Sequence, residues 1–227
     1  MTESTTRATD AARFSAKTVA TIGMLCAIAF VAKLISNVFP TVAGFLSFDL
    51  KDVIIVIAGF MMGPMTAAVV TLIVSLIEML TISSTGPIGL IMNVLASCSF
   101  ACVAAVIYRR DHSMKGAVAG LISGVVCMTV LMLLWNWLIT PIYMKVPREV
   151  VVSMLIPTFL PFNLVKGGIN ATLAMLLYKP IVTALRKANL IESGTSSRRS
   201  VKWGAMLVSV VLLASFVLLA LVLAGVI

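Results

Sequence analysis

The sequence predicts an all-α integral membrane protein with six or seven membrane-spanning helices, and three observations support this. Hydrophobic residues make up 61% of the 227-residue chain and charged residues only 11%, which is more apolar surface than a soluble domain of this size can bury. Apolar runs of about 18 residues or more, each long enough to cross a bilayer as a helix, recur along the chain. These runs lack the alternation of barrel strands, and lipid offers no partner to backbone polar groups, so helices are predicted.

Seven helices are predicted, separated by segments rich in proline, glycine and serine. They cover residues 17–38, 49–63, 65–82, 88–108, 116–139, 157–178 and 203–227, and the sixth begins between residues 157 and 161. The chain then divides into a polar N-terminus (1–16), a six-helix core (17–185), a basic linker (186–202) and an additional C-terminal membrane-spanning helix (203–227). The first apolar run exceeds a signal-peptide core and lacks a clear cleavage site, so we expect it to be retained.

The basic residues predict the orientation of the helices. The chain carries 17 Lys and Arg against 8 Asp and Glu, a formal charge of +9. Threading the helices back and forth places twelve basic residues on one side, namely Arg7, Arg13, Lys17, Arg109, Arg110, Lys115, Lys179, Arg186, Lys187, Arg198, Arg199 and Lys202. By the positive-inside rule this side is the cytoplasm, so a multi-pass protein with a cytoplasmic N-terminus is predicted. The charge is explained by topology in a lipid bilayer, and no nucleic-acid partner is expected.

Metal and disulfide chemistry are not predicted. The four cysteines lie within apolar runs, and Cys98 and Cys102 share a helix face with no histidine or carboxylate beside them. We expect such cysteines to pack as small hydrophobic residues, so no metal site is predicted.

Polar side chains within the predicted helices lie almost entirely toward the outer side of the membrane. They are Lys33, Asn37, Asp49, Asp52, Glu78, Asn93, Asn136, Asn163 and Lys166. The inner halves of the helices carry small residues instead. A channel or proton relay needs polar groups through the full depth of the membrane. The pattern therefore predicts a cup that is open to the outside and closed below.

Several of these residues also have purely structural interpretations. Lys33 can extend its ammonium group to the lipid headgroups, and Asp49 can cap the second helix. Asn93 can form a hydrogen bond between helices, and Trp135 can belong to an interfacial aromatic belt. Lys166 is least explained in this way, because it lies within an apolar run and has no carboxylate near it in the sequence.

The start of the sixth helix predicts a site that donates hydrogen bonds. Asn163 and Lys166 are three residues apart and share a helix face, and the helix N-terminus adds partial positive charge. Asn136 both donates and accepts, and Trp135 offers flat apolar surface. A planar heteroaromatic ligand with carbonyl groups and ring nitrogens matches this combination.

Two stripes of small residues, each with a spacing of four, permit close approach of another helix. The first consists of Gly23 and Ala27, and the second of Gly116, Gly120 and Gly124. Each stripe either packs within the bundle or forms a docking face for another membrane subunit.

Several motifs occur in a familiar order along residues 17–185. They are Phe45–Asp52 followed by Gly63-Pro64, then Ser84–Gly86 with Asn93, then Leu134–Asn136 followed by Pro141 and Tyr143, and finally Pro161–Gly167. In this order and spacing the chain resembles the riboflavin-specific substrate-binding subunits (S components) of energy-coupling factor (ECF) transporters. The last motif, Pro-Phe-Asn-x-x-Lys-Gly, is the most specific part of the resemblance.

The resemblance implies a six-helix S component that captures riboflavin from outside a bacterial cell and releases it during ATP-driven uptake. Its implied partners are a transmembrane coupling protein and two ATP-binding-cassette ATPases. The chain itself has no Walker A pattern, so we do not expect it to be an enzyme. Riboflavin is the expected transported ligand and no cofactor is expected.

The resemblance also implies roles for individual residues. The polar contacts to the flavin match Asn136, Asn163 and Lys166, and the loop that covers the site matches the region around Phe45 and Leu46. Together with the outer polar and aromatic residues, the expected substrate-binding set is Phe45, Leu46, Glu78, Asn93, Trp135, Asn136, Asn163 and Lys166. The expected docking residues are Gly23 and Ala27, with glycine where alanine is usual. The last helix has no counterpart in the six-helix core.

Three alternatives compete with this interpretation. A self-sufficient secondary carrier needs coupling-ion groups at mid-depth and usually internal repeats, and neither is evident. A membrane-embedded enzyme needs a nucleophile with a base or a metal cluster, whereas the one histidine, His112, lies in a basic loop. An S component for another vitamin or for a flavin nucleotide keeps the class and changes the ligand.

Overall fold

The computed structural model describes residues 16–44, 46–188 and 203–226. This part of the chain forms helices and no strand, which confirms the predicted all-α membrane fold. The helices are α1 (Ala16–Ser36), α2 (Lys51–Met62), α3 (Pro64–Thr81), α4 (Gly86–Arg110), α5 (Met114–Leu138), α6 (Thr140–Met144), α7 (Arg148–Met154), the π-helix η1 (Leu155–Phe159), α8 (Leu160–Lys187) and α9 (Trp203–Leu223).

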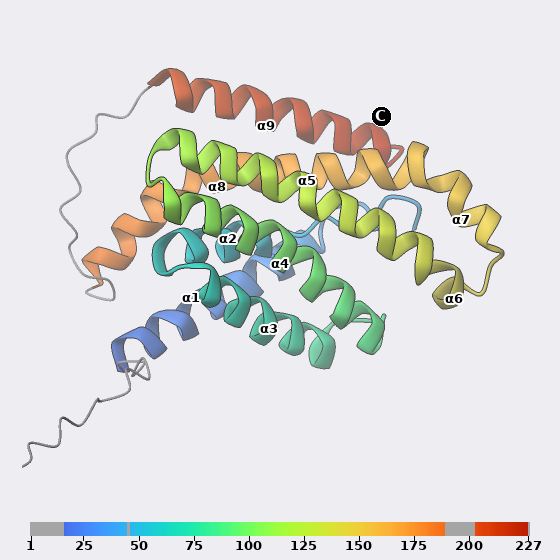
Figure 1. Ribbon diagram of the computed structural model, residues 1–227, viewed down its shortest axis with the longest axis horizontal. Coiled ribbons are helices and arrows are strands. Elements are labelled where there is room, and N and C mark those ends of the chain that lie inside the picture. The colour runs from blue at the N-terminus through green and yellow to red at the C-terminus, as the bar shows by residue number, and fades with distance from the viewer. Residues whose placement is uncertain (1–15, 45, 189–202, 227) are drawn as a thin grey trace, which may run out of the picture.

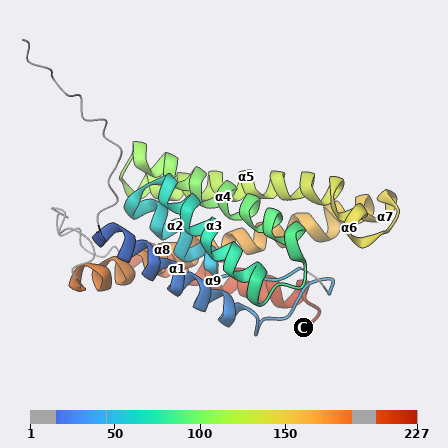
Figure 2. The same ribbon diagram turned by 90° about the horizontal axis from the view of Figure 1, so that it is seen from below.

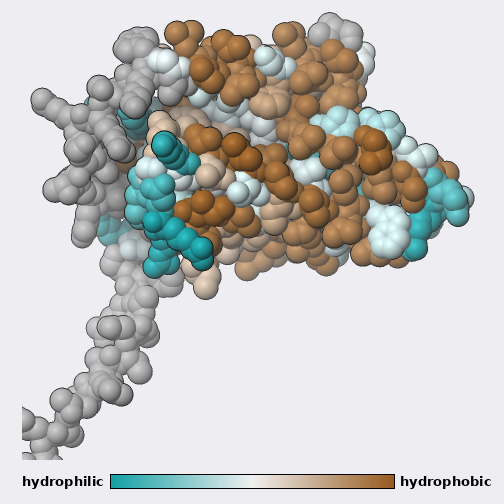
Figure 3. Space-filling view, turned by 45° about the horizontal axis from the view of Figure 1, so that its top comes forward, coloured by the Kyte–Doolittle hydropathy of each residue, from teal (hydrophilic) through white to brown (hydrophobic). Residues whose placement is uncertain are grey.

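Long helices run side by side along the molecule, and α9 lies against α8 at the edge opposite α3 (Figure 1, Figure 2). Within the described residues, six helical stretches are long and apolar enough to cross a membrane: α1, α3, α4, α5, Arg148–Leu185 and the larger part of α9. The surface agrees, because apolar residues cover the middle of the molecule and hydrophilic residues gather toward its two ends (Figure 3).

The second helix differs from its prediction. We expected a span over residues 49–63, but α2 has 12 residues, a length of about 18 Å, which is less than the apolar thickness of a bilayer. The segment between α1 and α2 is largely non-helical. Several of its residues line a cavity, and irregular backbone is tolerated at membrane depth where it lines a cavity.

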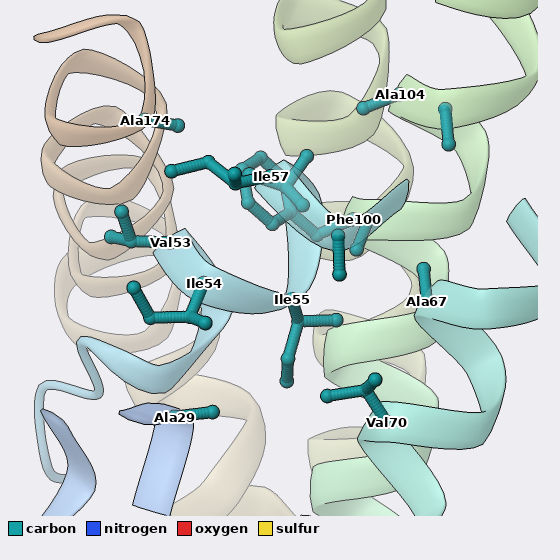
Figure 4. Packing of buried hydrophobic residues seen from close by; sticks show 14 of the residues in the cluster. Ala29, Val53, Ile54, Ile55, Ile57, Ala67, Val70, Phe100, Ala104 and Ala174 are labelled. Atoms are coloured by element: carbon teal, nitrogen blue, oxygen red, sulfur yellow. The ribbon is translucent and has the colours of Figure 1, made fainter. Parts of the chain in front are cut away.

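The short helix α2 forms the centre of the core. All ten residues from Lys51 to Phe60 are buried, and the helix contacts α1, α3, α4 and α8. Its isoleucine and valine side chains point outward in several directions toward these neighbours (Figure 4). A helix that is apolar around its whole circumference is stable only when surrounded, so this helix is enclosed by the longer ones.

The glycine stripe of α5 packs inside the bundle. A β-carbon on Gly120 would lie 2.6 Å from the carbonyl oxygen of Ala104, and one on Gly124 would lie 2.5 Å from that of Phe100. Both carbonyls belong to α4, so the glycines let the backbones of α4 and α5 approach closely. This stripe is therefore a packing feature and is not a docking face.

Two short helices and a π-helix occupy residues 140–159, where only a loop was predicted. They lead into α8, which begins at Leu160 as predicted. This helix then continues beyond the predicted end near Tyr178, through Pro180, to Lys187.

Candidate ligand-binding site

A cavity of about 370 Å³ lies at one end of the bundle, within the range of about 300–1,000 Å³ typical of small-molecule sites. Its walls come from α1, α3, α4, α5, α6 and α8, together with described residues of the segments 37–49 and 82–85. The basic residues Arg109 and Arg110 end α4 at the opposite end of the bundle. We call these the cavity end and the basic end.

Seven of the eight predicted substrate-binding residues line this cavity: Leu46, Glu78, Asn93, Trp135, Asn136, Asn163 and Lys166. The eighth, Phe45, lies outside the described residues. The fold thus brings together side chains that are up to 120 positions apart in the sequence, from Leu46 to Lys166.

A buried network of ion pairs joins four elements beside the cavity. The Nζ atom of Lys33 on α1 contacts the carboxylate of Asp49 and lies 3.4 Å from Oε1 of Glu78 on α3. The Nζ atom of Lys51 on α2 contacts Glu78. The Nζ atom of Lys166 on α8 lies 3.1 Å from Oδ2 of Asp49. Asp49 therefore connects α1 with α8.

The network corrects two structural interpretations. Lys33 does not extend to the headgroups, because its residue is only 6% exposed and its ammonium is ion-paired. Asp49 does not cap α2, since Leu50 occupies the N-cap position without a side-chain hydrogen bond. Lys166 does have a carboxylate partner, but it comes from a residue 117 positions away. The sequence marked these residues as unusual, because each is a charged residue near or within an apolar run. It did not show which lysine pairs with which carboxylate.

The charge of Asp49 depends on its lysine neighbours. The ammonium groups of Lys33 and Lys166 lie against its carboxylate, and a positive charge nearby favours the ionised form of a carboxyl group. Asp49 is therefore ionised at neutral pH, and the network retains its attraction between opposite charges.

A third carboxylate, Asp52, lies just beyond the network. Its Oδ1 accepts a hydrogen bond of 2.5 Å from Oγ of Ser97 on α4, and its residue is 1% exposed. The buried Lys33 and Lys51 and the largely buried Lys166 are thus balanced by three buried carboxylates, so this region has no net formal charge.

Two asparagine amides border the cavity from different helices. Nδ2 of Asn136 donates to the carbonyl of Met132 at 2.7 Å, and its Oδ1 accepts from Oγ1 of Thr140 at 2.8 Å. Nδ2 of Asn163 donates to the carbonyl of Phe159 at 2.8 Å. Each amide nitrogen carries a second hydrogen. These contacts orient both side chains and leave one donor on each for a ligand.

Apolar side chains supply much of the remaining wall. Met128, Met132 and Trp135 of α5 line the cavity, as does Phe162 of α8. The ring of Phe162 lies 5.1 Å from the ring of Phe48, centre to centre. The cavity therefore combines flat or flexible apolar surface with polar and charged side chains, and such a combination can both enclose and orient a small molecule.

The predicted docking residues lie on the surface of α1. Gly23 and Ala27 are both exposed, and a β-carbon on Gly23 would have no heavy atom within 4 Å. In contrast to the stripe of α5, this small-residue stripe has no partner among the described residues.

Comparison with known proteins agrees with this architecture. A family model described as the ECF transporter, substrate-specific component, matches residues 17–178. The chain belongs to the substrate-specific components of ECF transporters. The S component described here is 31% identical to the riboflavin transporter RibU of Staphylococcus aureus (strain TCH60), over 75% of this chain and 93% of that relative.

Two further similarities cover the same region of the S component. It is 28% identical to the riboflavin transporter FmnP of Bacillus subtilis (strain 168), over 77% of this chain and 98% of that protein. A solved S component of a bacterial ECF transporter superposes with a TM-score of 0.62 at 32% identity, over 74% of this chain and 96% of that one. These relatives are transport proteins, which agrees with the expectation that the chain is not an enzyme.

Proposed function

We propose that this S component captures riboflavin in the cavity from outside the bacterial plasma membrane and delivers it for ATP-driven uptake. The observation that carries the proposal is the convergence of Asn136, Asn163 and Lys166 on one cavity that is also lined by apolar side chains. The names of the relatives, which are riboflavin transporters, support the choice of ligand.

The chemistry of riboflavin suits these walls. Its tricyclic ring is flat and carries carbonyl oxygens and ring nitrogens, which accept hydrogen bonds from the two amides and from the Lys166 ammonium. The ring faces match the apolar surface of Trp135 and its neighbours. Its hydroxylated chain matches polar residues of the cavity such as Glu78 and Asn93. The ligand in this scheme is cargo and not a resident cofactor.

The orientation of the chain follows from its charges. The basic end carries Arg109 and Arg110 at the end of α4 and Lys115 at the start of α5. The positive-inside rule places this end in the cytoplasm, so the cavity opens to the outside. With this orientation the N-terminus is cytoplasmic.

The proposed partners are a transmembrane coupling protein and two ATP-binding-cassette ATPases, since ATP-driven uptake needs an ATPase and the chain has no Walker A pattern. The exposed stripe of Gly23 and Ala27 is the proposed docking face, because small residues allow close helix approach in lipid. Residues 17–185 form the proposed binding unit, to which the last helix is an addition.

Titration of the purified chain with riboflavin tests the ligand. We expect saturable quenching of riboflavin fluorescence with a dissociation constant in the nanomolar to micromolar range, together with flavin absorbance in protein purified from cells. Thiamine and biotin serve as controls and should not compete. Binding of one of these vitamins, with no binding of any flavin, would contradict the ligand assignment while leaving the family intact.

A Gly23→Leu substitution tests the docking face. A β-carbon at position 23 has no heavy atom within 4 Å among the described residues, and Gly23 is exposed, so riboflavin binding and thermal stability should stay unchanged. Uptake in membrane vesicles with the full transporter should be abolished, because the leucine holds a partner helix away. Val31→Leu, at another exposed position of α1, is the matched control and should transport normally. Normal uptake by the Gly23→Leu variant would exclude this face as the docking site.

A further inference from the structure

The last helix, α9, lies outside the region that the family model matches, residues 17–178. It packs along α8 on the edge of the molecule opposite α1 and α3 (Figure 1). It therefore leaves the exposed Gly23 face of α1 uncovered. The contacts of α9 with α8 indicate what it adds to the S component.

The ring of Phe216 on α9 packs directly against α8 at Gly168, and we call the space that the missing side chain leaves there the groove at Gly168. A β-carbon on Gly168 would lie 2.5 Å from Cζ of Phe216, so only glycine accommodates the ring in this position. One turn further along α9, Ala220 is 9% exposed. In lipid there is no hydrophobic driving force between helices, so close van der Waals packing of this kind stabilises their association.

Phe216 belongs to a cluster of apolar side chains that reaches the wall of the cavity, because Leu46 and Phe162 belong to both. Phe216 and Ala220 belong to the same hydrophobic cluster as Val42, Leu46 and Phe48, which lie in the segment between α1 and α2. The cluster is completed from α8 and η1 by Phe159, Phe162, Val165 and Ile169. Packing is thus continuous from α9 through α8 to the segment 42–48.

The described residues of the segment 42–48, which are 42–44 and 46–48, have little structure of their own. Its backbone is closed by two hydrogen bonds between Val42 and Leu46, of 2.9 and 3.0 Å. Its other attachment is side-chain packing, including the contact between Phe48 and Phe162. Leu46 on this segment and Phe162 on α8 both line the cavity. Opening this wall requires the segment to leave the cluster that α9 helps to form.

We propose that α9 is an intramolecular strap whose Phe216 side chain holds α8 against the segment 42–48, and thereby slows opening of the cavity and release of its ligand. The choice of riboflavin as the ligand in the experiment below rests on the proposed function. The proposal that α9 restrains the segment 42–48 does not depend on that choice. A tethered helix is always at high effective concentration, so the strap acts without a second protein.

Paired substitutions in the full chain, reconstituted in lipid nanodiscs, test the strap. Phe216→Ala empties the groove at Gly168, whereas Leu219→Ala removes a side chain of α9 that is 49% exposed. Two quantities are measured: the dissociation rate of riboflavin from its fluorescence recovery, and hydrogen exchange of the backbone amides of residues 42–48. We expect Phe216→Ala to raise both at least about fivefold, and Leu219→Ala to change neither.

The two measurements separate the possible failures. Equal dissociation rates and equal exchange in the Phe216→Ala and unmodified chains would overturn the strap. Absence of riboflavin binding by the unmodified chain would overturn the ligand proposal, while hydrogen exchange still decides the strap. If Phe216→Ala does not fold, Phe216→Leu keeps an apolar side chain and is expected to accelerate both processes to a smaller extent. Unchanged values in Phe216→Leu would then overturn the proposal.

Discussion

Replacement of Asp49 by asparagine is expected to destabilise the S component more than any other single change of charge. Asp49 is the carboxylate shared by Lys33 and Lys166, and all three side chains are largely withdrawn from solvent. Loss of one partner from a buried ion pair leaves an uncompensated charge, which costs about 3–5 kcal/mol. Asparagine keeps the shape of the side chain, so the loss of stability reports on the removal of its negative charge.

The expected destabilisation is measured as a fall in the thermal unfolding midpoint of the purified protein at neutral pH. Glu149→Gln removes a carboxylate at an exposed position of α7 and should leave the midpoint unchanged. Equal midpoints for Asp49→Asn and Glu149→Gln would mean that the buried network contributes nothing to stability.

A double substitution separates the ion pair from other effects of Asp49. In the chain carrying both Asp49→Asn and Lys33→Met, one of the stranded charges is gone. The combined loss of stability should therefore be smaller than the sum of the two single losses, by about 0.5–3 kcal/mol. Additive losses would show that Lys33 and Asp49 stabilise the fold independently.

Replacement of Lys166 by methionine is expected to weaken riboflavin binding by about 1–3 kcal/mol, or roughly 5- to 150-fold in the dissociation constant. The ammonium of Lys166 lines the cavity, so its loss leaves an acceptor of the bound flavin without a partner. Methionine retains a long apolar side chain. Asp49 keeps its ion pair with Lys33, so the fold should survive the change.

Fluorescence titration of the Lys166→Met variant measures this effect, with the thermal midpoint as a check on folding. Lys115→Met removes a lysine from the exposed surface at the basic end of α5, far from the cavity, and should bind riboflavin as the unmodified chain does. Unmodified affinity in Lys166→Met would remove this lysine from the set of flavin contacts.

Much of the fold followed from length and hydropathy, since a helix is the structure that satisfies its own backbone in lipid. The short α2 was the exception. Its apolar sequence is typical of a membrane-spanning helix, and the sequence alone did not reveal that α2 has only 12 residues and follows a largely non-helical segment. Such a segment is tolerated only beside a cavity, and the cavity exists only in the assembled bundle.

The candidate site was predicted in part from where polar residues fall along each helix. These positions grouped Asn136, Asn163 and Lys166 toward one side of the membrane, and all three residues border the cavity. The same pattern placed Lys33 and Asp49 on this side, and both line the cavity; only the structural alternatives, a headgroup contact for Lys33 and a helix cap for Asp49, were wrong. Depth follows directly from position in the sequence, but the direction in which a side chain points does not.

The sequence by itself therefore determined the class of protein, the positions of the long helices and the end of the bundle at which polar groups collect. Only the tertiary structure decided the rotation of each helix. In the folded protein the glycine stripe of α5 is packed against α4, whereas Gly23 and Ala27 of α1 are exposed. Lys166 is paired with Asp49. The physical reason is that lipid and protein core are similarly apolar, so a membrane helix lacks the polar face that would reveal its rotation.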